Sequence, residues 1–339
     1  IGGALWVPFA GAFLVAFLTA FSYLELVGKY PRAAGAALYT NRAFGSAFLT
    51  FIVAFAVMSS GITSASSAAV AFGRTYLKEF VTLPVWAVAI TFIVLLALVN
   101  FRGVGESVKA NVVLTCIELS GLLIIIAIGV AAVSSGQGEP SRLTQIDTTE
   151  SGVLLAITSA TALAFFAMVG FEDSVNMAEE VKQPAKIFPP AMLLGMAAAG
   201  LIYVLVALTS SLLVPAERLA TLESGALLEV VKIGAPGFPL GLFAVIGLFA
   251  VINSALINML MASRLVYGMA GERIIPRLLG SVHPTRRTPW VSILFTSAIA
   301  VVLVSFVPLT DLAGTTALLL LAVFTLVNVA CLVLRRDTV

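Results

Sequence analysis

The sequence has 339 residues, of which 60% are hydrophobic and 11% are charged, and its mean hydropathy is +1.10. A water-soluble domain would carry about twice as much charge, so the composition excludes that class and indicates a membrane protein. The net charge of +2 is too small to indicate nucleic-acid binding. A single histidine, and two cysteines without a ligand spacing, give metal sites and histidine-based catalysis little support. We therefore expect neither an enzyme nor a resident cofactor or metal.

Long apolar runs divide the chain into predicted membrane helices. About 20 apolar residues cross the hydrocarbon core as a helix. Connections rich in proline, glycine or charge separate the runs, and no soluble domain interrupts them. The expected fold class is an all-α polytopic membrane protein with a single transmembrane domain over residues 1–339. The nine predicted spans are 5–27, 44–73, 84–101, 110–133, 152–176, 191–214, 238–270, 289–307 and 312–334.

Lysine and arginine predict the orientation of these spans. With the N-terminus outside, 14 of the 19 basic residues fall on cytoplasmic segments, as the positive-inside rule requires. The C-terminus is then cytoplasmic, and we expect the chain in a cell inner or plasma membrane. An outside N-terminus is awkward for an unprocessed chain. We therefore expect one more span before residue 1, which would make the sequence a fragment.

Two parts of the chain resemble copies in opposite orientations. The second and seventh spans both carry polar residues at mid-depth, and the spans that follow them open with Pro84–Trp86 and Pro289–Trp290. The first opening lies outside and the second inside, which is typical of an inverted repeat. Residues 1–133 are then the remainder of the first repeat and residues 151–336 the second. The fifth span is left without a partner.

The fifth span contains the stretch Phe165–Glu180, FFAMVGFEDSVNMAEE. In an inverted-repeat bundle the first helix of each repeat is unwound at mid-membrane, where free backbone groups are tolerated only if they line a cavity. We expect the break at Gly170. The carbonyls of Ala167–Val169 would face a cationic group, and the positive end of the inner half-helix would suit Glu172 and Asp173. A continuous helix with an acidic end is the alternative.

Four motifs resemble the amino acid–polyamine–organocation family of permeases, which has the leucine-transporter fold. The resemblance covers nearly the whole chain and implies an inverted-repeat bundle with the family's second to tenth helices. It also implies that the first helix, with its Gly-x-Gly turn for the substrate carboxylate, and the last two are absent. We expect such a chain to be transport-deficient by itself. The motifs are SYLELVGKYPRAAGAALYTNRAFG (22–45), FFAMVGFEDSVNMAEEVKQPAKIFPPAM (165–192), INSALINMLMASRLVYGMAGERIIP (252–276) and HPTRRTPW (283–290).

The same resemblance implies positions for a substrate site. The family's aromatic gate falls on Phe166, its unwound backbone on the five residues that follow, and polar substrate-facing positions on the third and eighth family helices. Each of these residues could instead serve only in packing. The substrate-binding candidates are Phe166, Ala167, Met168, Val169, Gly170, Phe171, Thr63, Ser64, Asn253 and Asn258, and the coupling or gating candidates are Glu118, Glu172 and Asp173.

Glu118 lies well inside the fourth span, in VVLTCIELSGLL (112–123). An ionisable group at that depth is costly and indicates a function. Proton-coupled members of the family often carry a lysine at this place, which substitutes for a sodium ion. The hypothesis is that Glu118 is a protonation site whose apolar surroundings favour the neutral form. The alternative is a structural pairing with a neighbouring helix.

The resemblance implies a secondary active transporter, a permease that moves amino acids by alternating access and couples to a proton. The expected partners are a small amino acid or amine and the lipid bilayer. A polyamine exchanger and a sodium-coupled symporter on the same fold are alternatives, and a membrane scaffold or an inactive fragment is the non-transporting one. The substrate side chain, the coupling ion, symport or antiport, and the oligomeric state are left open.

Overall fold

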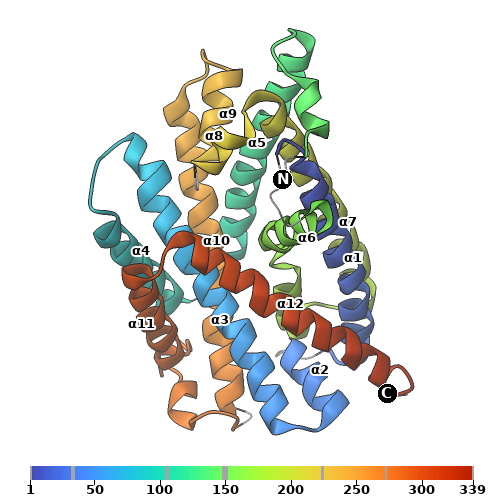
Figure 1. Cartoon of the computed structure of the whole chain (residues 1–339). Helices are drawn as coiled ribbons and strands as arrows, with labels where there is room; N and C mark the ends of the chain where they lie inside the picture. Colours follow the sequence, from blue (N-terminus) through green and yellow to red (C-terminus); the bar gives the residue numbers. More distant parts are fainter. Residues whose placement is uncertain are drawn as a thin grey trace.

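The structure is a computed structural model that describes residues 2–31, 35–103, 107–146, 152–222, 225–271 and 273–337. The described residues form a bundle of helices and no strand (Figure 1). Its α-helices are α1 (Trp6–Lys29), α2 (Gly35–Phe44), α3 (Ala47–Ala71), α4 (Val85–Arg102), α5 (Ser107–Ser134), α6 (Val153–Ala164), α7 (Pro184–Leu213), α8 (Ala216–Ala220), α9 (Ala226–Gly234), α10 (Leu240–Gly271), α11 (Trp290–Phe306) and α12 (Leu309–Leu334).

All nine predicted spans are helical. Within the described residues, eight helical segments are long and apolar enough to cross a membrane. The ninth, α11, has 17 residues, which at 1.5 Å per residue is about 26 Å, near the lower limit for a span. Large apolar side chains such as Leu154, Leu194 and Phe306 are exposed on the outside of the bundle, where lipid would cover them. The predicted all-α polytopic architecture is confirmed.

Three predicted connections turn out to contain helix. Part of the loop between the first two spans forms α2, and Gly35 begins it. The connection between the fifth and sixth predicted spans, 177–190, contains the start of α7 at Pro184, since a missing N–H costs nothing in the first turn of a helix. The short α8 and α9 likewise lie in the long loop at 215–236.

The helix ends follow local sequence. The Ser46 hydroxyl caps α3 by accepting a hydrogen bond from the Leu49 N–H at 3.3 Å, which satisfies one of the free donors of the first turn. Pro84 and Pro289 immediately precede α4 and α11. Gly103 ends α4 with a φ of +115°, a conformation that side-chain-bearing residues rarely adopt.

Two groups of helices are visible in the packing. α3 packs against α10, α11, α12 and α4, while α1 packs against α7 and α6 (Figure 1). Small residues permit the closest approaches, as is usual between membrane helices. A Cβ at Gly61 of α3 would lie 3.2 Å from the Asn258 carbonyl oxygen of α10, and a Cβ at Gly200 of α7 would lie 2.2 Å from Cδ2 of Phe13 on α1.

Candidate functional site

The helix that begins as α6 is interrupted where the sequence predicts a break. The α-helical segment ends at Ala164 and continues as a single 3-10 turn, Phe165–Met168. Val169 is extended, with φ −66° and ψ 136°, and Gly170 has a φ of +127°. A second 3-10 helix then runs over Phe171–Glu180. The predicted break at Gly170 is confirmed, and the continuous-helix alternative is wrong.

Glu172 satisfies the backbone at this break. Its Oε2 accepts a hydrogen bond from the Gly170 N–H at 2.9 Å, and the Gly170 carbonyl accepts one from the Asp173 N–H at 3.2 Å. Glu172 is only 4% exposed. The bond is partly buried, and a backbone N–H that leaves water without gaining a partner is costly. The carboxylate therefore stabilises the interrupted conformation.

An aromatic cluster holds the two sides of the break together. Phe165, before the break, packs against Phe324 of α12 with ring centroids 5.5 Å apart. Phe171, after the break, packs against the same ring at 5.1 Å. Tyr23 of α1 contacts both Phe171 and Phe324 at 5.6 Å. Such ring pairs contribute more stability than the burial of their apolar area alone. α1 and α12 therefore hold the two half-helices in place.

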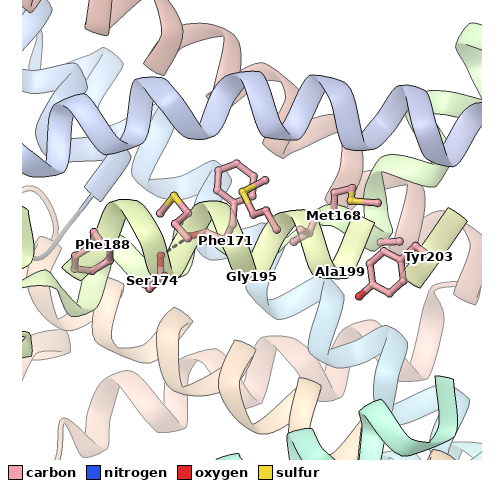
Figure 2. A pocket seen from close by; sticks show the side chains of 12 residues that line it. Met168, Phe171, Ser174, Phe188, Gly195, Ala199 and Tyr203 are labelled. Carbon is pink, nitrogen blue, oxygen red and sulfur yellow. Dashed lines mark hydrogen bonds between the residues drawn. The ribbon is translucent and has the colours of Figure 1, made fainter. Parts of the chain in front are cut away.

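A cavity of about 360 Å³ lies between the broken segment and α7 (Figure 2). In Figure 2, Phe188, Gly195, Ala199 and Tyr203 follow α7, and Phe171 and Met168 lie beside them. Among the side chains that the structure describes, none that lines the cavity is charged. The lining residues are Ala167, Met168, Val169, Phe171, Ser174, Phe188, Ala191, Met192, Gly195, Met196, Ala199 and Tyr203. A hollow of this size is in the range of small-molecule sites.

Glu172 does not face this cavity. It borders a second, much smaller one of about 10 Å³, together with Tyr23, Val57 and Leu265 among others. The Tyr23 hydroxyl is buried and has no hydrogen-bond partner in the described part of the chain. The small cavity has room for about one water molecule. The carboxylate at the break is therefore separated from the larger, apolar hollow.

Of the predicted substrate residues, Ala167, Met168, Val169 and Phe171 line the larger cavity, and the others do not. Phe166 is half-buried beside it, and Ser64 is buried in α3.

The other polar candidates are engaged in helix packing. The Thr63 hydroxyl shares a hydrogen bond with that of Thr316 on α12. The Asn258 amide donates to the Ser254 carbonyl in its own helix at 2.9 Å. Neither of these two hydrogen bonds involves a residue of the broken helix.

Asn253 instead contacts the predicted coupling residue. Its Nδ2 donates to Thr115 Oγ1 at 3.4 Å and to Glu118 Oε2 at 3.5 Å, and its Oδ1 accepts from Asn111 Nδ2 at 3.1 Å. These bonds join α5 and α10. Glu118 is half-buried, so the structure places an ionisable group in a polar seam between two spans. A role in joining helices and a role in coupling are both compatible with these contacts.

The sequence did not single out the α7 wall of the cavity. Ala191, Gly195 and Ala199 recur every four residues and so lie on one face of the helix. That spacing of small residues was the available signal. It is also the ordinary signal of close helix packing, so the sequence by itself does not distinguish the two.

An apolar helix bundle with one helix broken beside a cavity is typical of secondary transporters. The fold is similar to that of a Na⁺-coupled sialic acid symporter solved in a substrate-bound outward-open state, with a TM-score of 0.54 and 13% sequence identity over 95% of this chain and 72% of that one. At that identity the likeness concerns the fold, which is leucine-transporter-like.

The family model described as "Amino acid permease" matches residues 1–338, and the chain belongs to that family. It is 24% identical to the branched-chain amino acid permease BcaP of Bacillus subtilis, over 99% of this chain and 74% of that protein. It is 27% identical to the methylthioribose transporter of Bacillus subtilis, with the same coverage. It is 26% identical to the low-affinity putrescine importer PlaP of Escherichia coli, over 96% of this chain and 72% of that protein.

These relatives confirm the predicted family and identify a multi-pass membrane transporter. The family and the named relatives are permeases and transporters, not enzymes.

Proposed function

We propose that the protein is a secondary active transporter that moves amino acids across the cytoplasmic membrane by alternating access around the break at Gly170. The observation that supports this most directly is the interruption of the helix at Val169 and Gly170, next to a cavity of about 360 Å³ that is lined in part by Ala167–Val169. Free backbone groups at the middle of a membrane helix suit the charged ends of a small solute. Relatives that carry an amino acid and a putrescine agree with this substrate class.

In this proposal the ammonium of the substrate binds the carbonyls of Ala167–Val169, and Phe166, the neighbouring aromatic residue, closes over it. The group α1, α6 and α7 would rock against the group α3, α4, α10 and α11, in line with the packing of each group. Residues 1–133 and 151–336 would be the two inverted repeats that give the site its two openings.

Uptake into proteoliposomes tests this function. The full-length protein is reconstituted, and each of the twenty amino acids is offered in labelled form with and without an inward proton gradient. We expect accumulation of at least one amino acid above its outside concentration, and only with the gradient. Uptake that merely equilibrates would show a facilitator, and no uptake of any amino acid would refute the proposal. Replacing sodium by choline at constant pH tests the sodium-coupled alternative.

Glu118 is the proposed proton-coupling residue, because it is an ionisable group inside a span. Asn253 Nδ2 donates a hydrogen bond to Glu118 Oε2 at 3.5 Å and another to Thr115 Oγ1. A proton from the outside would neutralise the carboxylate when the site faces outward, and its loss inside would return the charge. Uptake should therefore rise as the outside pH falls.

Glu118→Gln should remove this pH dependence while it keeps an oxygen for Asn253. We expect the variant's initial rate to be flat between about pH 5 and pH 8 and its accumulation ratio to fall to about one. Initial rates at several outside pH values measure this. Glu217→Gln, an exposed carboxylate in α8, is the control and should keep the wild-type profile. A Glu118→Gln profile that still rises toward acid would reject Glu118 as the coupling site.

Glu172 is the proposed gating carboxylate, and two substitutions separate its charge from its hydrogen bond. Glu172→Leu leaves the Gly170 N–H without its acceptor, which should cost about 1–3 kcal/mol and lower the melting temperature. Glu172→Gln keeps an acceptor and should melt close to the wild type. Thermal unfolding in detergent compares them. Equal melting temperatures for the two variants would show that the bond to Gly170 contributes nothing to stability.

A further inference from the structure

The connection between α10 and α11 is strongly basic. Residues 273–289, which we call the basic connection, include four arginines and no acidic residue, and Glu272 directly precedes them. All four arginines are exposed, and none of them is paired with an acidic side chain in the described part of the chain. Their charges are therefore available to a partner outside the chain. They are Arg273, Arg277, Arg286 and Arg287.

The short helix α11 fixes the depth of this connection in the membrane. α11 begins at Trp290 and has 17 residues, which gives a length of about 26 Å, less than the hydrocarbon core of about 30 Å. Its first turn therefore lies at the boundary between lipid tails and headgroups. In that turn the Ser292 hydroxyl donates a hydrogen bond to the Leu279 carbonyl at 2.5 Å. This bond holds the 3-10 turn Arg277–Gly280 at the level of the headgroups.

The rest of the basic connection is held against the end of α4. The Thr288 hydroxyl donates a hydrogen bond to the Phe101 carbonyl at 3.2 Å. The rings of His283 and Phe101 pack edge to face, with their centroids 5.2 Å apart. The guanidinium carbon of Arg286 lies 5.7 Å from the centre of the same Phe101 ring, a distance at which a cation is attracted to the ring face. The arginines at 286 and 287 are therefore presented by a structured loop.

Large apolar side chains accompany the four arginines. Leu278 is 71% exposed, Val282 42% and Trp290 43%. At the boundary of the hydrocarbon core these side chains reach the lipid tails, and tryptophan is enriched at that depth in membrane proteins. Arginine side chains beside them extend toward the headgroups, because their stems are apolar and their ends are charged. The surface as a whole matches a molecule with an anionic head and an apolar tail.

From these observations we infer that the basic connection, together with Trp290, is a binding surface for anionic phospholipids of the surrounding bilayer. The guanidinium groups bind the phosphate of the headgroup, for which their planar, multiple N–H donors are well suited. Leu278, Val282 and Trp290 contact the acyl chains, which a soluble phosphate compound would lack. The inference goes beyond the proposed transport function and does not depend on it.

Quenching of Trp290 fluorescence by brominated lipids tests the surface. The full-length protein, with every other tryptophan replaced by phenylalanine, is reconstituted in phosphatidylcholine vesicles that contain brominated phosphatidylglycerol or brominated phosphatidylcholine. The two titrations give the relative binding constant of the anionic lipid at Trp290. We expect phosphatidylglycerol to bind at least about fivefold more tightly, the effect of one basic residue at an anionic surface. About 0.5 M NaCl should reduce this preference, because salt screens the charges.

Replacing the four arginines by glutamine should bring the relative binding constant to about one. Trp86, 63% exposed at the start of α4, is the matched control reporter, since residues 75–86 contain one lysine and one glutamate and so carry no net charge. It should show no preference. Equal constants at Trp290 in the wild type, a preference that survives the four substitutions, or the same preference at Trp86 would overturn the inference. Loss of the preference on adding glycerol phosphate at constant ionic strength would indicate a site for soluble phosphates and would also overturn it.

Discussion

Replacing Gly170 with alanine should remove most of the transport activity without unfolding the protein. The φ of Gly170 is +127°, and residues with a Cβ rarely adopt such values. A Cβ there meets no atom within 4 Å, so the effect comes from the backbone and not from a steric clash. Such strain costs about 1–3 kcal/mol, which corresponds to a roughly 5- to 150-fold smaller population of the broken conformation.

The initial rate of amino acid uptake measures the loss, and the elution and melting profiles in detergent verify the fold. Gly268→Ala is the control, because that glycine also faces open space but lies within α10 without a positive φ. It should transport like the wild type. A Gly170→Ala variant that transports at the wild-type rate would mean that the glycine conformation at the break is not needed for the carrier cycle.

A Gly200→Ala substitution should destabilise the bundle where α1 meets α7. Its Cβ would lie 2.2 Å from Cδ2 and 2.6 Å from Cγ of Phe13. Three ring atoms of Phe13 are this close, so the whole ring must move. Overpacking of this kind costs about 1–3 kcal/mol, and the melting temperature should fall by several degrees.

Gly195→Ala, in the same helix, provides the comparison. Its Cβ meets no atom, and alanine favours a helix over glycine by about 0.5–1 kcal/mol. The melting temperature of this variant should stay the same or rise. Thermal unfolding in detergent with a tryptophan or thiol-reactive signal compares the two. If both variants melt alike, the contact between Phe13 and α7 is looser than the structure indicates.

The spans and the break were predictable because each leaves a direct mark on the sequence. Twenty consecutive apolar residues have few alternatives to a membrane helix. Gly170, with Glu172 and Asp173 within the next three residues of such a run, breaks both the apolar pattern and the helix propensity. The hydrogen bond from the Gly170 N–H to Glu172 gives the physical reason why glycine and acid occur together.

The contacts of the polar candidates were not predictable in the same way. Asn253 and Thr63 are polar residues inside apolar helices, and the sequence says only that each needs a partner. The partners come from other helices, Glu118 and Thr115 for Asn253 and Thr316 for Thr63. The rotation of each helix about its axis decides these pairs, and an almost uniformly apolar helix carries little periodic signal of that rotation.

The α7 wall escaped prediction for a related reason. Gly195 and Gly200 are both glycines in an apolar helix, yet one borders an open hollow and the other is covered by Phe13. Five residues turn an α-helix by about 500°, so the two point in different directions. Which direction is empty depends on the neighbouring helices and not on α7 itself.

The single ring of Phe324 touches Phe165 on one side of the break and Phe171 on the other. A tilt of either half-helix must shift the Phe324 ring and so change the packing of the other half-helix. In the proposed alternating-access cycle, this shared ring would couple the movements of the two half-helices. Opening of the site to both sides of the membrane at once would then be disfavoured, because each half-helix could move only together with the other.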